Sequence, residues 1–309
     1  MALHYAIIVN PTAGKGSAMD KINNICRTLD SSKADYTLHI TEAPGHAVKL
    51  AREHGEQTDT AVIAAGGDGT CNEVINGLMS ITGRDYTPIL GAIPIGRGND
   101  FCFGAGIPSV PEEAVLRMLE EKTLKFDIGK VSGGDYPEGR WFGNGIGVGF
   151  DAVVGFEAAK MKHVHGAMAY TLGALKTLAI YPEAPQIEFT VNGTVSHIRP
   201  ALISVMNGRR MGGSFFMAPD GDPADGRLNW CHTKQEARLK LLAAMKAYTR
   251  GTQAERDDTE AGHGSTIHIR ALKGTLAVHA DGETICENGK ELEVGIRPGA
   301  LRLIGSSLI

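Results

Sequence analysis

The chain has 309 residues, of which 42% are apolar and 21% charged, and its 31 basic and 35 acidic residues give a net charge of −4. This balance, without a block rich in Lys or Arg, gives no electrostatic footprint for nucleic acid, so we expect no nucleic-acid partner. No apolar run approaches the ~18 residues of a membrane-spanning helix, and the first ten residues lack the basic start and cleavage site of a signal peptide. Five scattered cysteines without a CxxC spacing predict neither a disulfide frame nor a zinc site and favour the reducing cytoplasm.

Glycine is present in clear excess. A chain of this length would carry roughly 22 glycines at the usual ~7%, whereas this one has 40. The excess shows no three-residue period and comes with only 13 prolines, which excludes collagen and low-complexity tracts. Because glycine costs backbone entropy wherever it is not needed, we expect it at tight turns and where backbone approaches a ligand.

About the first 125 residues alternate short β-branched runs with helical patterns, which is typical of a parallel sheet wrapped by helices. The expected strands are Tyr5–Val9, Tyr36–Ile40, Ala61–Ala65 and Ile89–Pro94. The expected helices are Ser17–Leu29, Gly45–His54, Asn72–Met79 and Glu112–Glu120.

After Asp127 the pattern changes to strands bounded by turn residues. We place a domain boundary there, with residues 1–127 as a nucleotide-binding α/β domain and 128–309 as a β-rich domain; the last ~10–15 residues are free to return to the first domain. The expected features of the second part are a hairpin over 187–198 through Asn192-Gly193, another over 266–280 through Lys273-Gly274, helical insertions at 153–180 and 236–249, and a surface loop at Gly251–Gly264.

The first expected strand ends in a glycine-containing loop, Asn10-Pro11-Thr12-Ala13-Gly14-Lys15-Gly16, and a helix follows. Such a turn aims backbone N–H groups and the positive end of a helix at a phosphate. The Walker A pattern is not met anywhere in the chain. A plain strand-to-helix turn with a surface lysine is an equal alternative for this segment.

Two more loops follow the third and fourth strands. The third strand leads into Gly66-Gly67-Asp68-Gly69-Thr70 with Asn72-Glu73, and the fourth into Pro94-Ile95-Gly96-Arg97-Gly98-Asn99-Asp100-Phe101. Ligands bind at the carboxyl ends of parallel strands, so Asp68 is placed to act through a metal or on a proton while bare amides meet phosphate oxygens. A simple Asp-Gly turn is the alternative, but it does not need three glycines.

In order and spacing these three loops resemble the catalytic domain of the diacylglycerol kinase family, especially its soluble bacterial lipid kinases. The similarity continues through Asn144…Gly147-Val148-Gly149-Phe150-Asp151-Ala152, Asn207-Gly208…Gly212-Gly213, Pro219…Asp225-Gly226-Arg227-Leu228 and Asp281-Gly282-Glu283, and so covers nearly the whole chain. Gly-Gly-Asp-Gly is shared with NAD kinases, but the ordered set is specific. The resemblance implies a Rossmann-like parallel α/β domain of the NAD kinase and diacylglycerol kinase type, followed by a C-terminal β-sandwich.

The resemblance also implies site residues, an ATP phosphate donor and Mg²⁺. The implied ATP-binding residues are Asn10, Pro11, Thr12, Ala13, Gly14, Lys15, Thr41, Gly66, Gly67, Asp68, Gly69, Thr70 and Asn72. Glu283 is similar to the acceptor of the lipid hydroxyl proton, and Asp68 and Asp100 to the acids of the magnesium-linked network. Asp225, with the carbonyls of Asp222 and Arg227, is similar to a structural magnesium site. These roles suit phosphoryl transfer, which needs alignment, charge neutralisation and a proton acceptor but no covalent nucleophile.

Two of these residues have an open alternative. Glu283 also fits an exposed turn glutamate at the end of a hairpin strand. Arg97 stands where family members usually carry threonine; our hypothesis is that its guanidinium contacts the nucleotide phosphates, and the alternative is that it pairs with a nearby acid.

The leading prediction is therefore a cytoplasmic lipid kinase of phospholipid biosynthesis that phosphorylates diacylglycerol or a related lipid alcohol. It would meet the inner face of the membrane transiently, and an amphipathic helix at Ala237–Tyr248 could either lie on that surface or cover a core.

The alternatives are an NAD kinase, which would leave Asp-Gly-Glu unexplained, and a catalytically silent nucleotide- or lipid-binding module. His163 and His165 do not face each other on a helix and predict a surface rather than a metal site. The identity of the lipid, a homodimer and the purpose of Gly143–Gly149 are left open.

Overall fold

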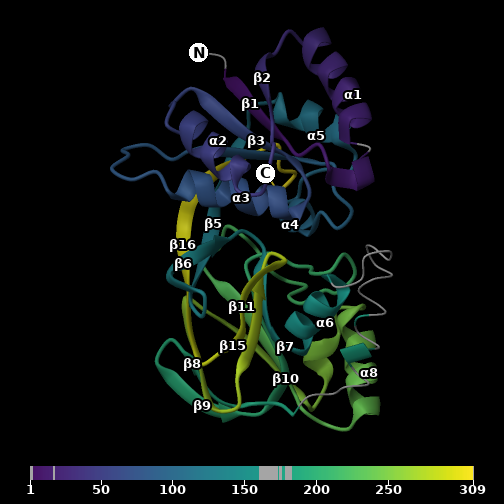
Figure 1. The fold of residues 1–309 in the computed structure, drawn as a ribbon, viewed down its shortest axis with the longest axis vertical. Coiled ribbons are helices and arrows are strands. Elements are labelled where there is room, and N and C mark those ends of the chain that lie inside the picture. Colours follow the sequence, from purple (N-terminus) through teal and green to yellow (C-terminus); the bar gives the residue numbers. More distant parts are fainter. Residues whose placement is uncertain (1–2, 17, 160–172, 174–175, 178–182, 309) are drawn as a thin grey trace. The chain divides into compact units, whose positions relative to one another are not determined.

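The computed structural model describes residues 3–16, 18–159, 173, 176–177 and 183–308 (Figure 1). The chain divides into two units. Unit 1 comprises Met1–Ile128, Pro223–Asp225 and Pro298–Ile309, and unit 2 comprises Gly129–Asp222 and Gly226–Arg297.

Unit 1 is built on a parallel sheet. Its strands are β1 (His4–Val9), β2 (Asp35–Ile40), β3 (Thr60–Gly66), β4 (Ile89–Pro94) and the end of β16 (Glu291–Ile304), in the order β2-β1-β3-β4-β16. Val9 pairs with both Ile40 and Ala65, and Ala65 with Ile93. The carboxyl ends of β1 to β4 therefore lie together along one edge of the sheet.

Helices cover this sheet because each presents an apolar stripe to it. The helical elements are η1 (Ala13–Gly16), α1 (Ala18–Ser31), α2 (His46–Gly55), α3 (Asp68–Met79), α4 (Asp100–Gly104) and α5 (Pro111–Met118). α1 and α5 share one core with Ile7 and Ile63 of the sheet, whereas α2 and α3 pack on each other and on β3. The predicted parallel α/β architecture is confirmed. α3 begins at Asp68 instead of Asn72, because Gly67 already takes the N-cap position.

Unit 2 consists of antiparallel sheets. One has the order β12-β11-β10-β7-β14-β15, with β7 at Gly145–Gly149, β10 at Pro200–Met206, β11 at Leu228–Lys234, β12 at Thr259–Gly264, β14 at Leu276–Ala280 and β15 at Glu283–Gly289. The other has the order β16-β13-β8-β9 and uses the start of β16, with β13 at Thr266–Lys273, β8 at Gln186–Val191 and β9 at Thr194–Ile198. In addition, β5 (Thr123–Gly133) pairs with β6 (Tyr136–Phe142). Ile203 and Val278 of the first sheet share one core with Phe189 and Ile269 of the second. This is the predicted β-sandwich.

Helices α6 (Phe150–Ala159) and α8 (Arg238–Tyr248) and the short η2 (Gln253–Glu255) complete the description of unit 2. α6 and α8 contribute to a separate apolar cluster with β10. The insertion expected at 236–249 is confirmed as α8. Of the insertion expected at 153–180, α6 is described, whereas most of the remainder, including His163 and His165, lies outside the described residues. No helix in the described ranges is long and apolar enough to cross a membrane.

The strand pairing confirms one hairpin and corrects another. β8 and β9 pair through Asn192-Gly193, whose φ angles of 47° and 85° are those of a two-residue hairpin turn. The hairpin expected over 266–280 is wrong, because β13 pairs with β8 and β16 while β14 pairs with β7 and β15. Lys273-Gly274 instead connects the two sheets. The loop expected at Gly251–Gly264 is also wrong at its end, where the polar segment Thr259–Gly264 forms an edge strand on β11.

Candidate functional site

Asn10 connects the first two glycine-containing loops of unit 1. It directly follows β1, and its backbone N–H donates to the Ala65 carbonyl at 3.1 Å. Its side-chain Oδ1 accepts from the N–H and the hydroxyl of Thr12 at 3.0 and 2.8 Å, and its Nδ2 donates to Thr70 Oγ1 at 3.3 Å. Thr41 belongs to the same edge, since its N–H donates to the Val9 carbonyl at 2.9 Å. The predicted residues Asn10, Thr12, Thr41 and Thr70 are thus brought together.

The loops after β3 and β4 touch through their backbones. The N–H groups of Ile95 and Gly96 both donate to the Gly66 carbonyl at 2.9 Å. A Cβ on Gly96 would lie only 2.4 Å from the Cα of Gly67, so only glycine permits this approach. Because glycine has no side chain, the groups that these loops can offer to a ligand here are peptide N–H groups.

The two acids predicted for this edge lie in the first turns of α3 and α4. Asp68 Oδ1 accepts from the Phe101 N–H at 2.9 Å. The Oδ2 atoms of Asp68 and Asp100 lie 2.9 and 3.7 Å from the point where a Cβ on Gly98 would stand, so both carboxylates flank the same small space. The sequence prediction that Asp68 and Asp100 act as neighbours is consistent with this placement.

The remaining predicted residues of unit 1 differ in their surroundings. Arg97 is exposed at the tip of its loop and forms no ion pair with the acids in the described part of the chain. Asn72 is fully buried and accepts hydrogen bonds from Asn76 Nδ2, so it lies inside the packing of α3. Gly14 lies within η1 with a φ of 61°, and the side chain of Lys15 is outside the described set. Pro11 and Ala13 are half-buried beside it, and Gly69 is in the first turn of α3.

The glutamate of the second motif has a role that sequence reasoning missed. The carboxylate of Glu73, on α3, accepts from the N–H groups of Gly45 and Ala47 at 2.9 and 3.2 Å. These are free N–H groups at the start of α2, where a negative charge is favourable. Glu73 therefore caps a neighbouring helix, and no local sequence pattern indicates a cap that comes from another element.

In unit 2, Asp281-Gly282-Glu283 forms the turn between β14 and β15. Asp281 and Gly282 have φ angles of 48° and 85°, and Ala280 pairs with Glu283 across the turn. The Glu283 side chain is 48% exposed, and its Oε2 lies 3.9 Å from Nη2 of Arg140. Glu283 is thus a turn glutamate by position, with a half-exposed carboxylate.

The residues of the predicted structural magnesium site lie in the irregular segment before β11. Asp222, Asp225 and Arg227 are all exposed, and Arg227 Nη1 lies 3.3 Å from His263 Nε2. No group of three His, Cys, Asp or Glu side chains that could hold a metal ion occurs among the described residues. Because the expected ligands include two backbone carbonyls, this magnesium site stays a prediction.

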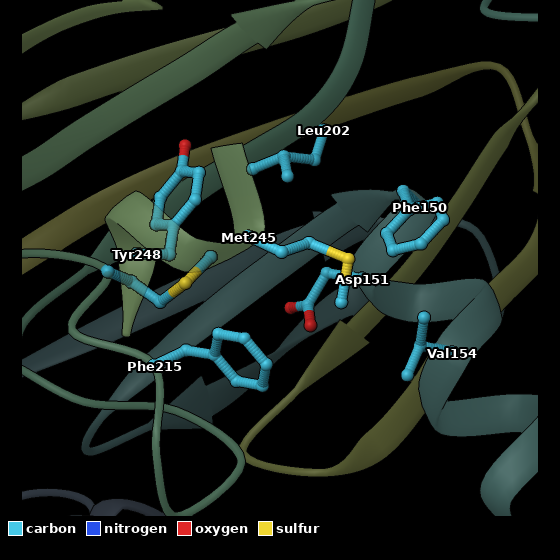
Figure 2. Close-up of a pocket in the computed structure, with 8 residues that line it drawn as sticks. Phe150, Asp151, Val154, Leu202, Phe215, Met245 and Tyr248 are labelled. Atoms are coloured by element: carbon cyan, nitrogen blue, oxygen red, sulfur yellow. The ribbon is translucent and has the colours of Figure 1, made fainter. Parts of the chain in front are cut away.

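An apolar pocket in unit 2 contains a single carboxylate (Figure 2). It is lined by Phe150, Asp151, Val154, Leu202, Phe215, Met217, Met245 and Tyr248. The Asp151 carboxylate lies among these apolar side chains, and its Oδ2 is 2.9 Å from Nε2 of the buried His279. A Cβ on Gly147 would stand 2.2 Å from Asp151 Oδ2, which gives one purpose for the glycines at 143–149. Burial also raises the pKa of Tyr248 at the wall of the pocket.

Comparison with known proteins assigns both parts of the chain. Residues 4–131 match the family model "Diacylglycerol kinase catalytic domain" and residues 144–305 match "YegS C-terminal NAD kinase beta sandwich-like domain". The chain is 29% identical over 301 residues to a diacylglycerol kinase of Mycobacterium tuberculosis, covering 96% of this chain and 93% of that protein. It is 31% identical over 251 residues to a diacylglycerol kinase of Bacillus subtilis, covering 79% and 78%.

Solved structures give the same fold. A putative diacylglycerol kinase from Bacillus anthracis superposes with a TM-score of 0.78 at 24% identity, covering 99% of this chain and 98% of that one. Yeast NADH kinase complexed with NADH superposes with a TM-score of 0.53 at 9% identity, covering 98% and 83%, which shows a shared fold alone. The matched models and relatives together show that this chain belongs to the diacylglycerol kinase family and is a kinase.

Proposed function

We propose that this kinase transfers the γ-phosphate of ATP to a hydroxyl of diacylglycerol or a related lipid alcohol. The observation that carries the proposal is the pocket of unit 2, because apart from one carboxylate it is lined almost entirely by apolar and aromatic side chains. Such a lining suits acyl chains, whereas a dinucleotide acceptor would need several polar partners. Diacylglycerol kinases among the relatives support the same acceptor class.

The pocket would have to open for an acyl chain. Its volume is about 30 Å³, which is close to the space of one water molecule. Met217 and Met245 lie in its wall, and methionine side chains are unbranched and adapt to irregular ligands. We therefore assign the opening of the pocket to rearrangement of these two side chains.

The three loops of unit 1 would hold the nucleotide. Asn10, Thr12, Thr41 and Thr70 are joined at the sheet edge, and the glycine backbones beside them offer N–H groups to phosphate oxygens. Exposed Arg97 would add a positive charge to the same phosphates.

Asp68 and Asp100 would hold Mg²⁺. Their oxygens flank one small space beside Gly98, and hard carboxylate oxygens are the ligands that Mg²⁺ prefers. When bound, Mg²⁺ neutralises the charge that develops on the phosphates.

Glu283 would take the proton of the lipid hydroxyl. As the hydroxyl oxygen bonds to the γ-phosphorus, its proton passes to the carboxylate, and the bond to the bridging oxygen breaks to release ADP. The half-exposed position of Glu283 leaves room for this contact, and Nη2 of Arg140 lies 3.9 Å from its Oε2.

The decisive experiment offers labelled ATP with Mg²⁺ and a total lipid extract to the purified protein. We expect a labelled phospholipid, whereas transfer to NAD and to no lipid would overturn the proposal. Glu283→Gln should lower the rate of transfer by on the order of 10²–10⁴-fold while nucleotide binding persists. Glu287→Gln, an exposed glutamate on the same strand, is the matched control and should keep wild-type activity.

Filling the pocket tests its assignment. Met245→Trp should raise the KM for a long-chain diacylglycerol by about tenfold or more, which corresponds to about 1.4 kcal/mol of lost binding, because the larger ring would occupy the space that an acyl chain needs. Val195→Trp, at an exposed position of β9, is the control and should leave the KM unchanged. An unchanged KM for Met245→Trp would place the acyl chain elsewhere.

Arg97→Thr tests the phosphate contact. A charge-assisted hydrogen bond contributes about 1.5–3 kcal/mol, so the KM for ATP should rise by about tenfold or more. Arg27→Thr, at an exposed position of α1, should leave this KM unaffected. An unaltered KM in Arg97→Thr would remove Arg97 from the nucleotide site.

A lipid acceptor requires transient contact with a membrane surface, which we assign to α8 at the cytoplasmic face. Leu239 and Leu242 are 79% and 39% exposed, and Lys240 and Lys246 lie on the same helix. Apolar and basic side chains together favour anionic lipid surfaces. The Leu239→Glu variant should therefore sediment less with anionic vesicles than the wild type does. Equal sedimentation of the two proteins would mean that another surface contacts the membrane.

A further inference from the structure

The carboxylate of Asp281 is bound by three consecutive backbone N–H groups. Gly143 N donates to Oδ2 at 2.8 Å, and the N–H groups of Asn144 and Gly145 donate to Oδ1 at 3.1 and 2.9 Å. Asp281 returns a bond, since its own N–H donates to the Gly145 carbonyl at 3.0 Å. The turn between β14 and β15 is thereby tied to the loop 143–145.

The loop 143–145 is itself fixed from its other side. The carbonyl of Gly143 accepts from Asn207 Nδ2 at 2.9 Å, and that of Asn144 accepts from the N–H groups of Asn207 and Gly208 at 2.8 Å. Asn144 and Asn207 are 5% and 0% exposed. Asp281 is therefore anchored to a loop whose own carbonyls are held by the buried segment at Asn207 and Gly208.

Glu283, two residues further on, takes its position from this anchor. Its backbone pairs with Ala280 across the turn that Asp281 and Gly282 form in left-handed conformations. Its side chain is half-exposed, and the ion pair with Arg140 is long at 3.9 Å. The direction of the Glu283 carboxylate thus depends mainly on where the backbone of the turn is held.

We infer that Asp281 is a positioning residue for Glu283, acting through the loop 143–145, and that it sets kcat without contacting the substrates. The inference rests on the proposed function, in which Glu283 accepts the hydroxyl proton. A displacement of about 1 Å at a reacting group can cost on the order of 100-fold in rate. A shift of the turn after loss of the carboxylate would be of this kind.

The chain offers a matched control for a purely structural role. Asn192 has a φ of 47° in the hairpin turn between β8 and β9, followed by Gly193 at 85°, so its backbone is nearly that of Asp281. Its Oδ1 accepts from the N–H groups of Ser265 and Thr266 at 3.0 and 3.1 Å. Asn192 therefore ties a turn to a neighbouring segment in the same way, but Glu283 is not part of that turn.

The experiment compares Asp281→Asn, Asp281→Ala and Asn192→Ala in the full chain, with kcat measured per folded molecule. We expect both Asp281 variants to lower kcat by about 10- to 100-fold while the KM for ATP stays within about twofold. Asn192→Ala should lose thermal stability as Asp281→Ala does but keep the wild-type kcat. A wild-type kcat in folded Asp281→Asn would overturn the inference.

A double variant separates positioning from general damage. In the Glu283→Gln background, Asp281→Asn should lower the residual rate by less than about twofold, because both act on one step; full multiplication of the two losses would contradict this. If neither Asp281 variant folds while Asn192→Ala does, Asp281 is a stability residue and the inference is overturned. Failure of the proposed function is distinguishable, since the wild type would then label no lipid.

Discussion

Replacing Gly147 with alanine tests how tightly the polar pair beside the pocket is packed. A Cβ at this position would stand 2.2 Å from Asp151 Oδ2 and 2.5 Å from His279 Nε2. These two atoms are themselves joined at 2.9 Å, and the side chains are 15% and 3% exposed. The new methyl group can therefore be accommodated only if the pair separates or β7 moves.

The expected cost follows from these contacts. The φ angle of Gly147 lies outside the left-handed region, so alanine meets no backbone penalty there. Overpacking costs about 1–3 kcal/mol, and a buried polar group that loses its partner costs about 1–3 kcal/mol. Because one displacement causes both losses, we expect Gly147→Ala to lower the free energy of unfolding by about 2–4 kcal/mol.

Urea unfolding followed by circular dichroism measures this change. Gly295→Ala is the matched control, because Gly295 is also a strand glycine and the nearest atom to its Cβ position is Ser265 O at 3.9 Å. We expect it to leave stability unchanged or raise it by about 0.4–1 kcal/mol. In a double variant with Asp151→Ala, the cost of Gly147→Ala should fall, since one clashing side chain is gone. A Gly147→Ala protein as stable as Gly295→Ala would refute the reasoning.

Three further predictions concern stability and reactivity. Glu73→Ala should lower the free energy of unfolding by about 1–2 kcal/mol, measured by urea unfolding, because two N–H groups at the start of α2 lose their acceptor. Burial raises the pKa of Asp258, but the hydrogen bond and charge of Arg256 outweigh it and hold this pKa below its usual value. The resulting stability is present above pH ~4 and is lost as the pH falls, so Asp258→Asn should weaken the acid dependence of the urea midpoint. Burial raises the pKa of Cys231 to about 11, so iodoacetamide at pH 8 should label the half-buried Cys26 well before Cys231, as read by mass spectrometry.

The elements of unit 1 could be predicted because each is specified locally. β-branched runs and helical periodicity mark its strands and helices, and parallel topology alone brings the ends of consecutive strands to one edge. The neighbourhood of Asn10 and Thr70 was therefore expected. Two features could not be predicted from the local sequence: the side chain of Asn72 is buried, and Glu73 caps α2. Both depend on how the tertiary fold places the helices.

The partners of strands in unit 2 depend on contacts far along the chain. The segments at 266–273 and 275–280 alternate as hairpin strands would, and the Lys273-Gly274 turn between them is suitable. They nevertheless join different sheets, because alternation specifies which face of a strand is buried but not the strand it pairs with. The edge strand at Thr259–Gly264 was missed for the same reason. It is polar and has no apolar alternation, and it is a strand because it pairs with β11.

Asp281-Gly282-Glu283 shows why local patterns separate turn and catalytic roles poorly. The sequence offered a hairpin turn and a proton acceptor as alternatives, yet the described geometry makes the tripeptide a hairpin turn whose exposed carboxylate is still available for chemistry. The feature that distinguishes it from the turn at Asn192 is the loop to which its first residue binds, and that loop, 143–145, lies more than 130 positions earlier in the chain. The two turns therefore differ in what anchors them, and for Asp281-Gly282-Glu283 the anchor is the row of backbone N–H groups at 143–145.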